Sequence, residues 1–178
     1  MAMTLITTNS DSTDVANMSF TGIDNTYKLY IFKFLDVNPA TDSGDFQFNG
    51  SDDTSSWSYD IIKTTTSFNA YNAESGGTPA VSYDSTNDLA QSTAYQSLAM
   101  DIGNGADESL AGTLWLFNPS NTTYVTHFYS RVNYYWSGNG SEERYIGGYF
   151  NITGAITALD FKMDSGNMDG TIKMYGVG

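Results

Sequence analysis

The stretch Tyr27-Lys28-Leu29-Tyr30-Ile31-Phe32-Lys33-Phe34-Leu35-Asp36-Val37 decides the fold class of this chain. In an extended strand its apolar side chains fall on both faces, with Leu29, Ile31, Leu35 and Val37 on one and Tyr30, Phe32 and Phe34 on the other. A strand with one solvated face alternates strictly between apolar and polar residues, whereas a strand covered on both faces, or lying at a subunit contact, need not. β-Branched and aromatic residues dominate, which disfavours a helix. The stretch predicts a central strand of a β-sandwich.

Segments of strand length, separated by turns rich in Gly, Asn, Asp and Pro, lie on both sides of this stretch. We expect further strands within residues 15–20, 45–49, 57–61, 62–71, 98–102, 110–117, 124–136, 144–150, 156–163 and 171–177, with a helical or irregular turn near 87–94. The turns at 38–44 and 165–170 predict hairpins between the strands that flank them. The pattern is typical of an all-β, jelly-roll-like β-sandwich of about eight to ten short antiparallel strands.

The length of 178 residues suits one domain. We expect residues 1–13 to form an N-terminal arm or edge strand and residues 14–178 a single sandwich domain. The expected core comprises Leu29, Ile31, Phe34, Leu114, Leu116, Phe161 and Ile172. The N-terminus lacks the basic and apolar regions of a signal peptide, and no stretch approaches the ~20 apolar residues of a membrane span, so we expect a soluble protein made in a cytoplasm.

The charge balance excludes several classes of partner. The chain has 20 acidic and 7 basic residues, a formal net charge of −13, and no cysteine. Nucleic-acid affinity depends on clusters of Lys and Arg against phosphates, and docking on an anionic membrane also needs positive charge. We therefore expect neither nucleic acid nor membrane as a partner, and the absence of cysteine argues against a disulfide-stapled secreted protein.

The sequence offers little for catalysis. The single histidine, His127, lies in an aromatic strand on the face opposite Phe128. Glu142 and Glu143 are adjacent and point apart, so they make a poor acid–base pair. No nucleophile elbow, phosphate-binding loop or zinc spacing is present. The sequence favours a non-enzymatic protein.

Acidic turns raise the question of bound calcium, which prefers oxygen ligands. Candidate ligands occur at Asp42 and Asp45, at Asp52 and Asp53, and at Asp164 and Asp169. None of these groups matches the twelve-residue calcium-loop spacing, and Asp is common in turns because it hydrogen-bonds to nearby backbone. We therefore expect no cofactor, with calcium as the alternative.

Exposed aromatic and apolar residues point to contacts with other molecules. Tyr134, Tyr135 and Trp136 are consecutive beside a Gly-rich turn, so at least one of them leaves the core of an extended segment. Such a cluster contacts another protein chain or, in an alternative interpretation, stacks on a sugar through Trp136 and Tyr135. We expect a protein interface formed by these three residues with Leu5 and Ile6 of the N-terminal arm. Together with the two-sided apolar strand, they favour a homo-oligomer, most specifically a trimer.

Three stretches in order carry a family resemblance: GIDNTY (22–27) through VNPATD (37–42), SLAGTLWLFNPS (109–120), and FKMDSGN (161–167) with GTIKMYGV (170–177). Their order and spacing resemble a β-rich family of tailed-bacteriophage virion proteins, frequent in phages of aquatic bacteria including cyanobacteria. The resemblance covers nearly the whole chain. It carries no catalytic residues.

The resemblance implies a virion structural protein made in the host cytoplasm. A short arm and no long fibrous region favour a capsid cement (decoration) protein on the outer surface of the head, with the major capsid protein and copies of itself as partners. The alternative is a tail or fibre-tip module that binds host-surface carbohydrate. The acidity agrees with an outward-facing subunit that does not approach packaged DNA.

Overall fold

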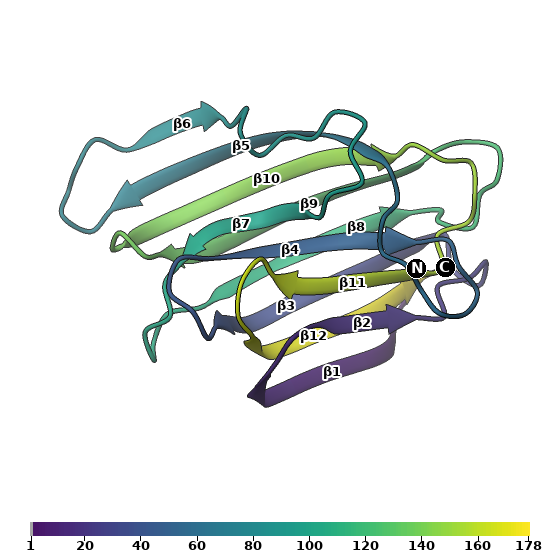
Figure 1. Cartoon of the computed structure of the whole chain (residues 1–178), viewed down its shortest axis with the longest axis horizontal. Helices are drawn as coiled ribbons and strands as arrows, with labels where there is room; N and C mark the ends of the chain where they lie inside the picture. The colour runs from purple at the N-terminus through teal and green to yellow at the C-terminus, as the bar shows by residue number, and fades with distance from the viewer. Residues whose placement is uncertain (1) are drawn as a thin grey trace.

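The computed structural model describes residues 2–178, and within them the chain is all-β, with twelve strands and no helix (Figure 1). The strands are β1 (Met3–Val15), β2 (Met18–Thr21), β3 (Leu29–Pro39), β4 (Gly44–Ser51), β5 (Lys63–Ala73), β6 (Ala80–Tyr83), β7 (Gln96–Ile102), β8 (Leu110–Phe117), β9 (Thr126–Trp136), β10 (Gly140–Phe150), β11 (Ala158–Met163) and β12 (Met168–Val177). The expected all-β class is confirmed, and the strands are more numerous than expected.

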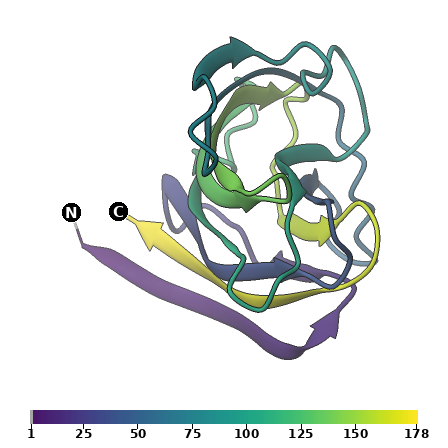
Figure 2. The same ribbon diagram turned by 90° about the vertical axis from the view of Figure 1, so that its left-hand side faces the viewer.

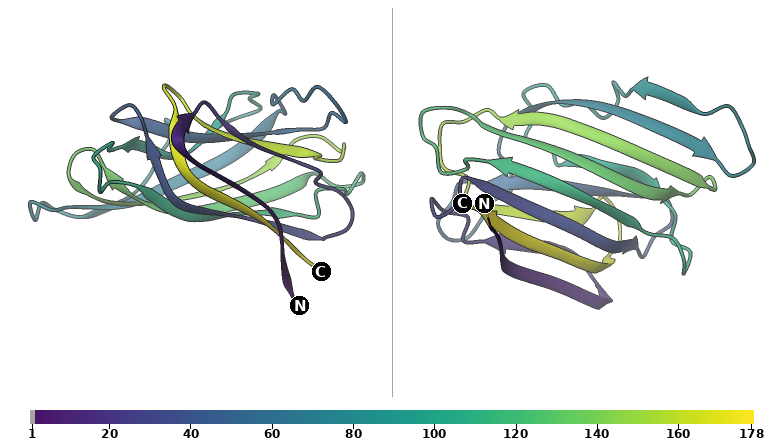
Figure 3. Two further views of the ribbon diagram at one scale, coloured as in Figure 1. Left: turned by 90° about the horizontal axis from the view of Figure 1, so that it is seen from below. Right: turned by 180° about the vertical axis from the view of Figure 1, so that it is seen from behind.

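The strands form two layers that face each other. The larger layer has the order β1-β12-β3-β8-β9-β10-β5-β6 and is seen from behind in Figure 3. The smaller layer has the order β2-β11-β4-β7. All pairs are antiparallel, and one bridge between Ile102 and Trp136 joins β7 to β9, so the two layers are continuous at one side.

The strand order is that of a jelly roll. The smaller layer supplies one four-stranded sheet, and β3-β8 with β5-β6 supplies the other. The hairpin β9–β10 is inserted between β8 and β5, and β12 and β1 extend the larger layer at its other edge.

Two expected hairpins are wrong. β3 and β4 flank the turn at 38–44 but pair with strands of different layers, and the same holds for β11 and β12 around the turn at 165–170. In both cases the turn carries the chain across from one layer to the other. The turn at residues 137–139, by contrast, joins a true hairpin in which Trp136 pairs with Gly140.

Other differences concern the middle of the chain. Residues 57–61 form no strand, and β5 begins at Lys63. The short strand β6 lies between residues 71 and 98, where no strand was expected. The irregular alternative near residues 87–94 is the observed one, and a strand follows it at Gln96.

Strand β3 lies in the larger layer, with Tyr30, Phe32 and Phe34 pointing to the interior. The alternation changes after Phe34, because the pairing with β8 shifts between Phe34 and Val37 and Asp36 has a φ of 52°. The shift places Val37 in the interior and leaves Leu35 at the surface, so these two do not share one face as expected.

A cluster of phenylalanines fills the space between β3 and the smaller layer. Phe161 is at its centre, with ring centroids 5.3–6.2 Å from those of Phe20, Phe32, Phe34, Phe46 and Phe48. Six of the seven expected core residues are buried, and Leu29 is half-buried. Ile31 is 8% exposed but points to the outer face of the larger layer, so five of the seven belong to the interior cluster.

Strand β1 is an edge strand. It pairs with β12 from Met3↔Val177 to Val15↔Met168, and within the described residues it pairs with no other strand. The β1–β12 ribbon runs out beyond the sandwich, so the described N-terminal end lies beside the C-terminus (Figure 2). Of residues 1–13, expected as an arm or edge strand, residues 3–13 therefore belong to the larger sheet as its edge strand.

Candidate functional site

The larger layer extends past the smaller one, and its overhanging inner face is polar. Strands β10 and β5 place Arg144 opposite Asn69 and Glu142 opposite Tyr71. Arg144 and Glu142 occupy the same inward alternation as the core residue Ile146. Charged side chains thus occupy positions that the alternation of β10 directs into the interior.

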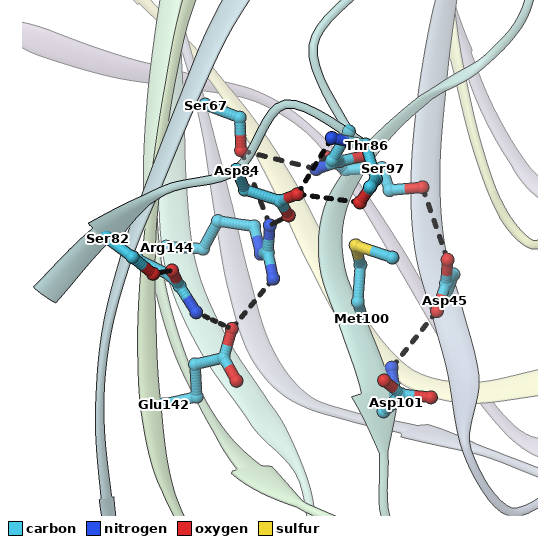
Figure 4. Close-up of polar contacts among 12 residues, drawn as sticks. Asp45, Ser67, Ser82, Asp84, Thr86, Ser97, Met100, Asp101, Glu142 and Arg144 are labelled. Carbon is cyan, nitrogen blue, oxygen red and sulfur yellow. Dashed lines mark hydrogen bonds and ion pairs between the residues drawn. The ribbon is translucent and has the colours of Figure 1, made fainter. Parts of the chain in front are cut away.

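Arg144 holds two carboxylates in place (Figure 4). Its Nη2 donates to Glu142 Oε1 at 2.7 Å, and its Nη1 donates to Asp84 Oδ2 and, at 3.3 Å, to Ser67 Oγ. Burial alone would raise the pKa of Asp84, but hydrogen bonds from Thr86 and Arg144 outweigh burial and lower it. Both carboxylates are fixed in position by charge-assisted hydrogen bonds.

Neighbouring groups complete this network. Asn69 Nδ2 donates to Glu142 Oε1 at 2.9 Å, and Ser82 Oγ donates to Asn69 Oδ1 at 2.8 Å, so both ends of the Asn69 amide are oriented. The Tyr134 hydroxyl accepts a hydrogen bond from the Met100 amide at 3.3 Å, and burial raises the pKa of Tyr134. Hydrogen bonds from neighbouring residues therefore orient the Glu142 carboxylate and the Asn69 amide.

The network opens into a cavity of about 380 Å³. Its lining residues come from β5, β7, β9, β10 and the loop after β6: Asn69, Tyr71, Asp84, Met100, Asp101, Trp136, Glu142 and Arg144. Tyr71 and Trp136 form an aromatic wall, with ring centroids 6.4 Å apart and planes inclined by 54°. The Trp136 indole rests over Gly138, where an added Cβ would lie 2.3 Å from Cη2. We call these eight residues the polar cavity.

The three consecutive aromatics expected to act together are separated by the structure. Tyr134 is 2% exposed and buried in the core, which removes it from any surface contact. Tyr135 and Trp136 are both half-buried but, as neighbours in a strand, point to opposite faces of the larger layer. Trp136 alone lines the polar cavity, so Tyr135 cannot share a sugar with it there.

A second feature is a line of apolar side chains on the outer face of the larger layer. Paired residues in adjacent strands share a face, and the register connects Leu5, Tyr175, Ile31, Trp115 and Tyr129 across β1, β12, β3, β8 and β9. Leu5 is 51% and Tyr129 47% exposed, and the Trp115 and Tyr129 rings lie 4.7 Å apart. We call these five residues the outer aromatic row.

Positive charge gathers beside the outer aromatic row. The next row of paired residues contains Lys173, Lys33 and Arg131, three of the seven basic residues of the chain. Lys33 Nζ lies 5.7 Å from the Trp115 ring centroid. Arg131 forms an exposed ion pair with Glu143. A strongly acidic protein therefore presents a mixed aromatic and basic strip on this face.

The remaining candidates stand apart from both features. His127 is exposed and opposite the buried Phe128, and Glu142 and Glu143 point to opposite faces, within strand β10 rather than a turn. Ile6 is exposed at a register shift of β1. Within residues 2–178 no three His, Asp or Glu side chains gather as a metal site, and the carboxylates of Asp53 and Asp164 accept hydrogen bonds from backbone amides.

Sequence reasoning missed most of the polar cavity. The available signal was the pair of charges at Glu142 and Arg144 in the same alternation as Ile146 and Phe150. Asn69, Tyr71 and Asp84 gave no signal, because only the pairing of β5 with β10 and the path of the loop after β6 bring them there.

Comparison with protein-family models, curated proteins and solved structures finds no match to this chain. Residues 2–178 contain no helix of the length and apolarity needed to cross a bilayer.

Proposed function

We propose that the chain is a non-enzymatic structural protein of a tailed-bacteriophage virion, most specifically a cement protein on the outer surface of the head. Its partners would be the major capsid protein and copies of itself, arranged as a trimer. The observation that carries the proposal is the outer aromatic row with its adjacent basic residues.

The outer aromatic row has the composition of a protein interface. Aromatic residues and Arg are enriched at interfaces, where desolvated aromatic anchors provide most of the binding free energy. The row crosses five adjacent strands on a rigid sheet, so its side chains are positioned without a prior ordering step. Lys33, Lys173 and Arg131 suit a partner surface with exposed carboxylates, and such charge complementarity speeds and orients docking.

Strand β1 supplies a second contact element. Its outer edge is unpaired in the described chain, and it contains neither Pro nor Lys, the residues that commonly protect an edge. An unpaired edge accepts an extended strand of another chain by main-chain hydrogen bonding. Because Leu5 belongs both to β1 and to the outer aromatic row, one partner can engage both elements.

The test is location followed by substitution. An antibody against this chain, applied to virions that contain it and viewed by electron microscopy, is expected to label the head over its whole surface. Heads lacking the protein are then incubated with purified chain, and the double variant Trp115→Ala/Tyr129→Ala is expected to reduce occupancy at least about tenfold, since each aromatic anchor contributes on the order of 1–2 kcal/mol.

Trp57→Ala is the matched control, because Trp57 is 39% exposed and belongs to neither the outer aromatic row nor the polar cavity. It is expected to bind heads as the unmodified chain does. Labelling confined to the tail would overturn the cement proposal, and so would undiminished occupancy by the double variant.

A further inference from the structure

We propose that the polar cavity binds a neutral pyranose unit of a glycan. The cavity lies on the inner side of the larger layer, and the outer aromatic row lies on its outer side, so this inference stands whether or not the chain is a cement protein.

The first support is the shape and make-up of the aromatic wall. Tyr71 is 37% exposed and Trp136 is half-buried, and both residues line the cavity. Their inclined planes form a corner rather than a flat stack. The C–H-rich face of a pyranose can pack against one ring while its edge contacts the other, and aromatic faces attract such polarised hydrogens.

The second support is a set of carboxylates beside the aromatic wall, where Glu142 pairs directly with Tyr71. The carboxylates of Asp84 and Glu142 are held by Arg144, and Asp101 adds an exposed carboxylate at the mouth of the cavity. Carboxylates accept hydrogen bonds from hydroxyl groups and can take two at once. Groups that are oriented in advance bind a ligand without losing further conformational entropy.

The balance of charge selects the kind of sugar. Asp84, Asp101 and Glu142 face the single cation Arg144, whose guanidinium is already engaged by two of them. An anionic sugar or a phosphate would meet uncompensated negative charge, which costs free energy in a partly enclosed site. Asp84 already accepts hydrogen bonds from Thr86 and Arg144 at its two oxygens, so the carboxylates open to the hydroxyl groups of a neutral sugar are those of Glu142 and Asp101.

The network is costly for the fold. The Arg144 side chain is 4% exposed, its Nε has no hydrogen-bond partner among the described residues, and Glu142 is 7% exposed. Burying an ion pair in place of packed apolar side chains is on balance neutral or destabilising, and an unsatisfied buried donor adds to the cost. Buried charges that lower stability in this way are found most often at functional sites.

The experiment is saturation-transfer-difference NMR on the purified full chain. The probes are glucose, galactose, mannose and N-acetylglucosamine, each at about 10 mM because a small ligand in one site binds weakly. Sialic acid is the anionic comparator. At least one neutral sugar is expected to give signals from its ring protons, and sialic acid is expected to give none.

Two variants test whether the sugar binds in the polar cavity. Tyr71→Ala and Trp136→Leu are each expected to reduce the neutral-sugar signal about tenfold, whereas Trp115→Ala on the outer aromatic row leaves it unchanged. If Trp136→Leu is misfolded by circular dichroism, Tyr71→Ala decides, because its ring is more than a third exposed and makes no hydrogen bond in the described chain. Asp101→Asn keeps the shape of the residue at its positive φ of 53° and is expected to weaken binding more mildly.

Three outcomes would overturn the inference: no signal from any neutral sugar, an equal signal from sialic acid, or a signal that survives both Tyr71→Ala and Trp136→Leu. None of these outcomes bears on the cement proposal, whose test depends on Trp115, Tyr129 and head binding.

Discussion

The interior of the sandwich is built in two different ways on its two sides. Between β3 and the strands β4 and β11, it consists of phenylalanines at 0–1% exposure, with Phe161 at the centre. Beneath β5 and β10, it contains buried polar side chains: Lys63, Thr65, Ser67, Asn87, Gln96, Glu142 and Arg144. We refer to these as the aromatic half and the polar half.

The difference follows from what covers each half. Strands of the smaller layer cover the aromatic half, and their backbone groups are satisfied within the ladder. The polar half is covered in part by the irregular segment 84–95, whose backbone groups need other partners. Thr65 illustrates the solution, since its Oγ1 accepts from the Leu89 amide at 2.8 Å and donates to Gln96 Oε1 at 2.6 Å. An interior covered by a loop thus requires polar side chains, because they satisfy the backbone groups of the loop. An interior covered by strands can be apolar.

The largest expected effect tests the aromatic half. Phe161→Ala removes a ring that contacts five others in a site with no exposure, and such truncations cost about 3–5 kcal/mol. Urea unfolding followed by tryptophan fluorescence measures the change in the free energy of unfolding. A cost below about 1 kcal/mol would mean that the phenylalanine cluster is loosely packed, and the contrast between the halves would fail.

The corresponding test of the polar half is Arg144→Met. It leaves the buried Glu142 and the half-buried Asp84 without their cation, and breaking a buried pair in this way costs on the order of 3 kcal/mol. Adding Glu142→Leu to the same chain is expected to restore part of the loss, because one uncompensated charge is removed. If the double variant is less stable than Arg144→Met alone, then the network stabilises the fold beyond its charge pairing.

The aromatic half and the polar half were not equally predictable from sequence. Alternation located the strands at 110–117 and 124–136 and five of the seven core residues, because burial of apolar side chains has a local signature. The polar half has no such signature, because polar residues are predicted to lie at the surface unless the segment that covers them is known. Thr65 and Ser67 in a Thr-rich segment are an example.

The connections between strands were the other feature that the sequence did not predict. The turns at 38–44 and 165–170 have the composition of hairpin turns, yet each leads from one layer to the other. Gly, Asn and Asp permit a reversal of the chain but do not specify whether the strands that follow pair or face each other. That choice depends on distant strands: β8 occupies one edge of β3 and β12 the other, which leaves no edge for β4.

A smaller effect comes from pH. Lys63 Nζ is buried and donates to Asn49 Oδ1 at 2.9 Å and to the carbonyls of Ile61 and Ala94, with no carboxylate in contact. Burial lowers the pKa of Lys63 from 10.5 to about 7, against a weak opposing effect of Asp60. The unfolded chain therefore binds more protons than the folded chain above about pH 7, so stability rises with pH from there toward 10.5.

We expect the free energy of unfolding to increase by about 1 kcal/mol per pH unit between roughly pH 7 and 9. Lys63→Met is expected to be less stable overall, since three acceptors lose their donor, but its stability is expected to stay flat across this range. Urea midpoints measured at several pH values provide the comparison. A flat profile in the unmodified chain, or the same slope in Lys63→Met, would contradict the assignment to this lysine.

The smallest expected effect compares one substitution at two buried threonines that differ in their hydrogen bonds. Thr65 in the polar half makes two hydrogen bonds through its hydroxyl, whereas Thr126 on β9 is 1% exposed and its Oγ1 has no partner among the described residues. Thr→Val replaces the hydroxyl by a methyl group of similar volume. It should therefore destabilise at Thr65 by about 1–2 kcal/mol, because the Leu89 amide loses its acceptor, and stabilise at Thr126 by up to about 1 kcal/mol, because a desolvated hydroxyl is removed. Paired urea titrations of the two variants measure the sign of each change. Opposite signs mean that the hydrogen-bond partners at a position decide whether a polar side chain is stabilising there, and a loss of stability at both would mean that the Thr126 hydroxyl has a partner of its own.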